Sequence, residues 1–153
     1  MKYLIASLLL AFLGGIARAA QLDVRIEKSV GASNRVLINL IVSNTSKKPT
    51  CLDASIVGLD SEILRPVFKV ARNGTEVNYI GVQASRLPGS SIIISPGRVV
   101  SISLDLTDDY DFSEFGEYSL QYDFLNISNC AELRLNEFLK SNVLILTRSS
   151  FHR

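Results

Sequence analysis

Apolar and polar residues alternate along most of the chain after residue 20, and this two-residue period predicts a series of short β-strands. The clearest case is Val100, Ile102, Leu104 and Leu106, which alternate with polar residues. Predicted strands cover Leu22–Lys28, Arg35–Asn44, Cys51–Val57, Val67–Ala71, Thr75–Ile80, Ser91–Ser95, Val99–Leu106, Gly116–Leu125 and Asn142–Thr147.

Turn residues separate these runs. Asn73-Gly74 lies between two apolar runs and predicts a tight hairpin, because both residues tolerate positive φ. Pro96-Gly97 fits a type II turn, with proline setting its own φ and glycine taking the positive value. Asn129 with Glu132 has capping-box spacing, which predicts a short helix over Ala131–Lys140.

Many short strands with turn signals between them predict an all-β fold, an antiparallel immunoglobulin-like β-sandwich of about eight strands. No long helical patterns alternate with the strands, so a parallel α/β sheet is not expected. The length suits one domain, which we place at residues 20–153.

Residues 1–19 have the pattern of a signal peptide. Lys2 precedes an apolar run from Leu4 to Ile16, and Ala17-Arg18-Ala19 has the small residues that signal peptidase reads. The alternative is a membrane anchor, but a spanning helix needs about 20 apolar residues. We therefore expect a secreted or periplasmic protein that has no integral membrane association after cleavage.

Export would place Cys51 and Cys130 in an oxidising compartment, where they are expected to form a disulfide. Two separate buried thiols, or one reactive thiol, are the alternatives. No His or basic cluster lies beside either Cys in the sequence to lower its pKa, which a nucleophile would need.

The amino-acid composition argues against several classes of function. Lys and Arg number 16 against 15 Asp and Glu, which gives no support for nucleic-acid binding. The single His, His152, cannot form the His pair of a zincin, and two Cys are too few for a multi-Cys zinc module. We expect no cofactor, no metal and no catalytic residues.

A set of short motifs, in order and spacing, resembles the N-terminal β-sandwich domain of the deuterolysin and peptidyl-Lys metalloendopeptidase family of secreted zinc proteases. The resemblance covers roughly residues 22–148. The matching residues are Asn44-Thr45-Ser46, Phe68-Lys69-Val70, Arg72-Asn73-Gly74, Val77 to Gly81, Arg86 with Pro88, Ile94 with Pro96-Gly97, Asp105-Leu106, Tyr110-Asp111, Gly116-Glu117-Tyr118, Tyr122 and Ser141-Asn142-Val143.

The resemblance implies the fold and a setting near secreted proteases, but this sequence lacks the family's His-Glu-x-x-His motif. We therefore expect a secreted, non-catalytic module that binds a protein partner, as a regulator or inhibitor of a secreted metalloprotease. The alternative is a carbohydrate- or surface-binding accessory module or a structural envelope protein.

Three further features are candidates for function, and a fourth is a candidate structural motif. Arg86-Leu87-Pro88 is an extended loop segment that could contact a partner. Asn44, Asn73 and Asn126 begin Asn-x-Ser/Thr sequons, which could carry glycans if the source is eukaryotic. The acidic residues at 105–111 could gather around Ca²⁺, although solvated turns explain them better. Tyr118, shortly after Asp111 and Gly116, fits a tyrosine corner.

Overall fold

The computed structural model describes residues 21–30, 35–58, 62–84, 91–130 and 133–148, with no description of the side chains at 128, 129 and 133–135. Ten strands form three antiparallel sheets in these residues. The first sheet has the order β1-β2-β7, from β1 (Leu22–Lys28), β2 (Leu37–Asn44) and β7 (Val99–Asp105).

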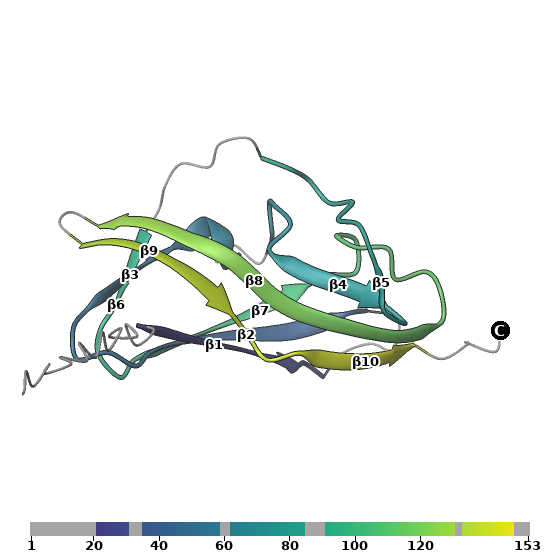
Figure 1. Cartoon of the computed structure of the whole chain (residues 1–153), viewed down its shortest axis with the longest axis horizontal. Helices are drawn as coiled ribbons and strands as arrows, with labels where there is room; N and C mark the ends of the chain where they lie inside the picture. Colours follow the sequence, from purple (N-terminus) through teal and green to yellow (C-terminus); the bar gives the residue numbers. More distant parts are fainter. Residues whose placement is uncertain (1–20, 31–34, 59–61, 85–90, 131–132, 149–153) are drawn as a thin grey trace, which may run out of the picture.

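The second sheet is built around the long strand β8 (Gly116–Cys130), and Figure 1 shows β8 running along most of the molecule. One side of β8 pairs with β4 (Phe68–Arg72), which in turn pairs with the short β5 (Thr75–Glu76). The other partners are β9 (Leu133–Lys140), along the second half of β8, and β10 (Leu144–Arg148), along the first half.

The third sheet contains only β3 (Thr50–Asp53) and β6 (Ser91–Ile94). A single 3-10 turn, η1 (Ala54–Ile56), follows β3, and its first turn is capped by the Asp53 carboxylate, which accepts from the Ser55 amide at 2.9 Å. The strand expected over Cys51–Val57 therefore ends early, because this cap favours a helical turn.

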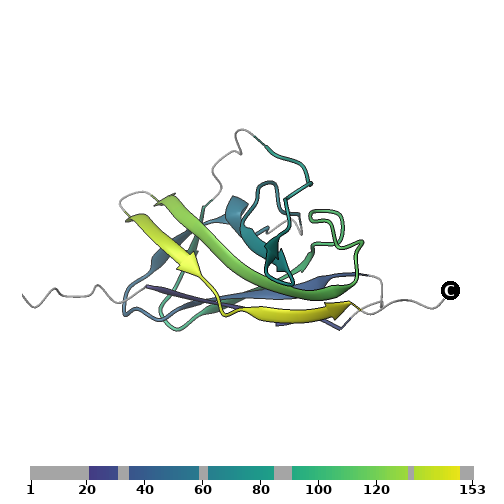
Figure 2. The same ribbon diagram turned by 45° about the vertical axis from the view of Figure 1, so that its right-hand side comes forward.

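The core lies between the first two sheets, as the layers in Figures 1 and 2 indicate. Alternate residues of each strand point inward, as the sequence pattern predicts. The inward set includes Val24, Ile26, Ile38, Leu40, Val42 and Leu104 from one sheet, and Val70, Tyr118, Leu120 and Tyr122 from the other. The prediction of an all-β antiparallel sandwich is confirmed, and the immunoglobulin-like type stays a prediction.

Both predicted turns are present. Asn73 and Gly74 have φ values of 47° and 83°, and they join Arg72 to Thr75 in the β4–β5 hairpin. Gly97 has φ 71°, and the Arg98 amide donates to the Ser95 carbonyl at 3.1 Å across Pro96-Gly97. In both turns a left-handed position is filled by glycine, at no steric cost.

The helix expected over Ala131–Lys140 is wrong: Leu133–Lys140 forms strand β9. Its register pairs Leu133 with Cys130 and Lys140 with Asp123, so it covers an edge of β8 that would otherwise be unpaired. Within it, Leu139 is buried whereas Phe138 is exposed, which is the alternation of a half-buried strand. Tertiary pairing thus overrides a weak local preference for helix.

The disulfide between Cys51 and Cys130 is confirmed, with Cα atoms 5.9 Å apart. It joins the small β3–β6 sheet to the end of β8, and it spans 79 residues in sequence. The alternatives of free or reactive thiols are thereby excluded for both cysteines.

Candidate functional site

The predicted partner loop and the predicted signal peptide cannot be placed. Arg86, Leu87 and Pro88, and residues 1–19, lie outside the described residues. The loop and the leader therefore stay predictions.

Two of the three sequon asparagines are buried structural residues. The Asn44 amide, 1% exposed, donates to the carbonyls of Lys48 and Ile94, both at 2.8 Å. Asn126 is fully buried between β8 and β3, where its amide donates to the Cys51 carbonyl at 3.1 Å and accepts from the Asp53 amide at 3.0 Å. A glycan on either would displace these bonds.

The third sequon asparagine, Asn73, lies at the exposed β4–β5 turn. Its side-chain oxygen accepts from the Glu117 amide at 3.1 Å. The residue type at this position is therefore already explained by backbone geometry and by this hydrogen bond.

The acidic residues at 105–111 are arranged as turns. Asp105 accepts from the Thr107 amide at 3.0 Å and pairs with Arg35, and Asp111 accepts from the Ser113 amide at 3.0 Å. Within the described residues, no three His, Cys, Asp or Glu side chains converge as metal ligands would.

Asp109 differs from Asp105 and Asp111 in the direction of its pKa shift. Burial, then the negative charges of Asp105, Asp108 and Glu62, raise its pKa to about 6.

The tyrosines support the fold through their hydroxyl groups. Tyr118 donates to the Glu114 carbonyl at 2.8 Å, which is the tyrosine corner expected from the sequence. Tyr110 donates to the Phe68 carbonyl at 2.9 Å, and Tyr122 to the Ile56 carbonyl at 3.1 Å. Burial raises the pKa of Tyr110 and Tyr122 well above the usual value for tyrosine. The hydroxyl groups of these three tyrosines therefore stabilise the fold through hydrogen bonds to backbone carbonyls.

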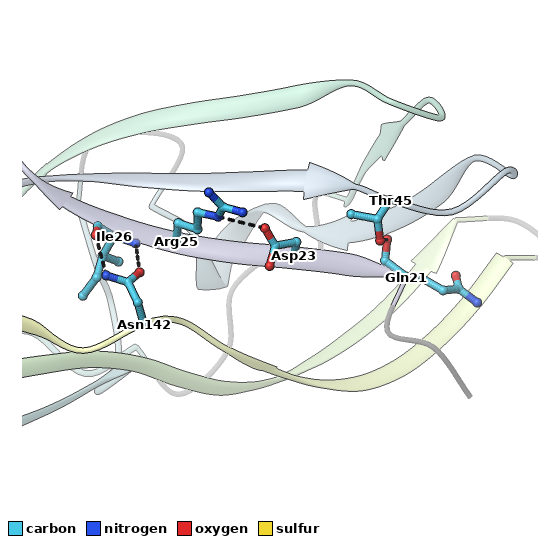
Figure 3. Close-up of polar contacts among 6 residues, drawn as sticks. All are labelled: Gln21, Asp23, Arg25, Ile26, Thr45 and Asn142. Carbon is cyan, nitrogen blue, oxygen red and sulfur yellow. Dashed lines mark hydrogen bonds and ion pairs between the residues drawn. The ribbon is translucent and has the colours of Figure 1, made fainter. Parts of the chain in front are cut away.

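A seam runs between β1 and the β9–β10 side of the other sheet, and we call it the β1 seam. The Gln21 amide donates to the Glu137 carboxylate at 3.0 Å at one end. In the middle, the Asn142 side chain accepts from the Ile26 amide at 2.9 Å and donates to the Ile26 carbonyl at 3.0 Å, as Figure 3 shows. Asn142 thus pairs with β1 as a neighbouring strand would.

These contacts identify the open edge of β1. On the β2 side, the Gln21 carbonyl accepts from the Thr45 amide and the Ser29 amide donates to the Leu37 carbonyl. In an antiparallel pair alternate residues point their backbone groups to opposite edges. The Ile26 amide and carbonyl both bond Asn142. The backbone groups of the even-numbered residues of β1 therefore face the seam. By the same parity, the backbone groups of Lys28 face it too.

The seam opens into a cleft of about 390 Å³ at the end of β1 and β10, which we call the basic cleft. Its floor includes Phe112 and Tyr118, which are 3% and 1% exposed and whose ring centroids lie 5.1 Å apart. Its described lining residues include Lys28, Arg35 and Arg148 and no acidic side chain. The arrangement combines an apolar floor with a cationic rim.

A second exposed feature lies on the outer face of β8 and β9. Leu125 pairs with Phe138 across the two strands, and Ile127 follows on the same face of β8. Phe138 and Ile127 are 72% and 63% exposed. We call Leu125, Ile127 and Phe138 the β8–β9 patch. Charged residues border it, because Lys140 pairs in register with Asp123, which bonds Lys69 at 2.8 Å.

Sequence reasoning missed both the basic cleft and the β8–β9 patch. The helix expected over Ala131–Lys140 prevented the patch from being predicted. The alternation of apolar and polar residues around Phe138 would have indicated a strand. The cleft left no local signal, since Lys28, Arg35 and Arg148 come from three separate segments.

No protein-family model matches the chain. An extracellular protease of Aeromonas hydrophila is 31% identical over 122 residues, which cover 77% of this chain and 34% of the protease. The chain therefore spans about a third of the length of this curated relative. The match supports a protease-related partial domain.

A Bacillus subtilis protein described as a lipoprotein has a solved structure that is 16% identical, with a TM-score of 0.32 over 78% of this chain and 33% of that chain. This likeness is too distant to carry an argument. In the described part of the chain, no helix is long and apolar enough to cross a membrane. The disulfide and the extracellular relative fit a secreted protein.

Proposed function

We propose that this chain is a secreted, non-catalytic β-sandwich module that binds a protein and regulates or inhibits a secreted protease. The observation that carries the proposal is the similarity to one third of an extracellular protease. A segment joined to a protease domain has surfaces that contact it. This sandwich keeps such a surface and binds a protease domain through it, and the deuterolysin-type resemblance makes a metalloprotease the first partner to test.

The β8–β9 patch is where we expect this contact. Large exposed apolar residues that lie together and are bordered by charges are typical of protein interaction sites. The patch is also held on a rigid support, because β9 pairs with β8 along this part of the strand and the disulfide joins the end of β8 to β3. A surface fixed in this way loses little conformational freedom on binding.

The test is a titration of the whole exported chain against the part of the A. hydrophila extracellular protease that lies outside the matched region. Calorimetry measures binding, and cleavage of a peptide substrate measures activity. We expect an equimolar complex and an activity change that saturates at one equivalent. No detectable complex at tens of micromolar, with activity unchanged, would refute the proposal.

A matched pair of variants locates the interface. Phe138→Ser removes an aromatic ring from the β8–β9 patch, whereas Phe115→Ser removes one that is 60% exposed in the segment before β8. We expect Phe138→Ser to weaken the complex at least tenfold and Phe115→Ser to change it less than twofold. Equal effects of the two changes would place the contact elsewhere on the module.

A further inference from the structure

The basic cleft has the composition of a site for an apolar group that ends in a carboxylate. Arg35 is already paired with Asp105, but no ion pair of Lys28 or Arg148 occurs among the described residues. Guanidinium and ammonium groups bind carboxylates through charge-assisted hydrogen bonds. The buried rings of Phe112 and Tyr118 line the same cleft and supply apolar surface.

The neighbouring edge of β1 restricts what can enter. A peptide that adds to a sheet edge forms backbone hydrogen bonds along that edge. Here the backbone of Lys28 faces the seam, but the Ile26 amide and carbonyl are both occupied by Asn142. A strand passing along β1 would have to displace Asn142. A chain end that stops beside Lys28 would not.

The size of the cleft agrees with this restriction. Its volume of about 390 Å³ is near the lower end of the range of about 300–1,000 Å³ typical of ligand sites. That space suits one or two residues of a peptide. The cationic rim favours the negatively charged carboxyl terminus over the positively charged amino terminus.

We propose that the basic cleft binds the carboxyl-terminal residue of an extended peptide whose last side chain is apolar. The terminal carboxylate lies between Lys28 and Arg148, and the last side chain packs on Phe112 and Tyr118. The backbone of the peptide end pairs with the edge of β1 at Lys28. This site is distinct from the β8–β9 patch, and the inference does not rest on regulation of a protease.

The experiment measures fluorescence polarisation of a fluorescein-labelled pentapeptide that ends in leucine, added to the whole exported chain. The probe is used with a free terminal carboxylate and with a terminal amide. We expect the amide to bind at least tenfold more weakly than the acid. Lys28→Gln and Arg148→Gln should each weaken binding of the acid about tenfold and leave binding of the amide nearly unchanged.

Lys47→Gln is the matched control, because Lys47 is an exposed cation in the turn between β2 and β3, away from the cleft lining. It should change binding of the acid less than twofold. Amide NMR shifts, recorded as the acid is added, should be largest at Lys28, Val36 and Arg148. Lys28 and Lys47 are exposed and Arg148 is half-buried at the end of β10, so thermal melts of the variants should match the unaltered chain.

Three results would overturn the inference. The acid and the amide could bind equally, or the Lys28 and Arg148 variants could bind the acid as the unaltered chain does. Alternatively, decanoate could bind at the cleft while the peptide acid fails to displace it, which would make the cleft a site for aliphatic carboxylates alone. None of these results bears on the protease titration, so the two proposals can fail separately.

Discussion

Replacing Asn126 with alanine should destabilise the fold strongly, because this side chain joins two sheets from a fully buried position. Its amide group bonds the Cys51 carbonyl and the Asp53 amide on either side of Leu52. Alanine removes both bonds and leaves two buried backbone groups without these partners. Leaving a buried group unsatisfied costs about 1–3 kcal/mol. We therefore expect a loss of about 3 kcal/mol.

Urea unfolding followed by far-ultraviolet circular dichroism measures this loss, with the disulfide kept intact in every sample. For a slope of about 2 kcal/mol per molar urea, the midpoint should fall by about 1.5 M. Asn136→Ala is the matched control, since Asn136 is exposed on β9 opposite Ile127. The control should lose less than about 0.5 kcal/mol, the usual range for surface changes.

The reasoning is wrong if Asn126→Ala and Asn136→Ala unfold at the same urea concentration. Such a result would mean that β3 is held to β8 by the disulfide and by apolar packing alone. A changed slope with an unchanged midpoint would instead indicate an altered unfolded state.

Three further predictions concern stability. Replacing Cys51 and Cys130 by alanine opens a link of 79 residues and should cost about 4 kcal/mol; guanidinium unfolding checks this, and a loss below about 1 kcal/mol would contradict the chain-entropy argument. Tyr118→Phe removes the 2.8 Å hydrogen bond to the Glu114 carbonyl and should lower the free energy of unfolding by about 1 kcal/mol. Thermal melts measure this loss. An unchanged melting temperature would show that the tyrosine corner does not stabilise the fold. The pKa of Asp109 is raised to about 6, first by burial and then by the negative charges of Asp105, Asp108 and Glu62. Folding therefore favours the protonated form of Asp109. The stabilisation that this gives is fully present below about pH 4 and is lost as the pH rises through about 6. Asp109→Asn should therefore be neutral near pH 4 and stabilising by about 1 kcal/mol at pH 8, after allowance for solvent screening; equal effects at both pH values would refute the assignment.

Local patterns predicted most of the strands. The alternation at residues 99–106 and 36–42 corresponds to β7 and β2, whose inward residues form one side of the core. The two turns were predicted because glycine, and asparagine to a lesser degree, tolerates positive φ regardless of what surrounds it. These features need only neighbours in sequence, so a single sequence reveals them.

The error over Ala131–Lys140 shows where local reasoning ends. Cap-like residues and a mixed pattern were compatible with a helix, but the edge of the long strand β8 made a strand the better partner. The same limit applies to the sequons. Asn44 and Asn126 have the sequence of glycan acceptors, and only the packing of β3, β6 and β8 shows that their amides are buried.

The sequence by itself determined the all-β class and the positions of the tight turns, and it predicted the pairing of the two cysteines. The tertiary structure decided which strand covers each edge, that Asn142 occupies the edge of β1, and that Lys28, Arg35 and Arg148 surround one apolar cleft. The physical reason is the separation along the sequence between the residues that interact. Alternation and φ preferences act between neighbours, whereas Asn142 and Ile26 are 116 residues apart and meet only when two sheets pack.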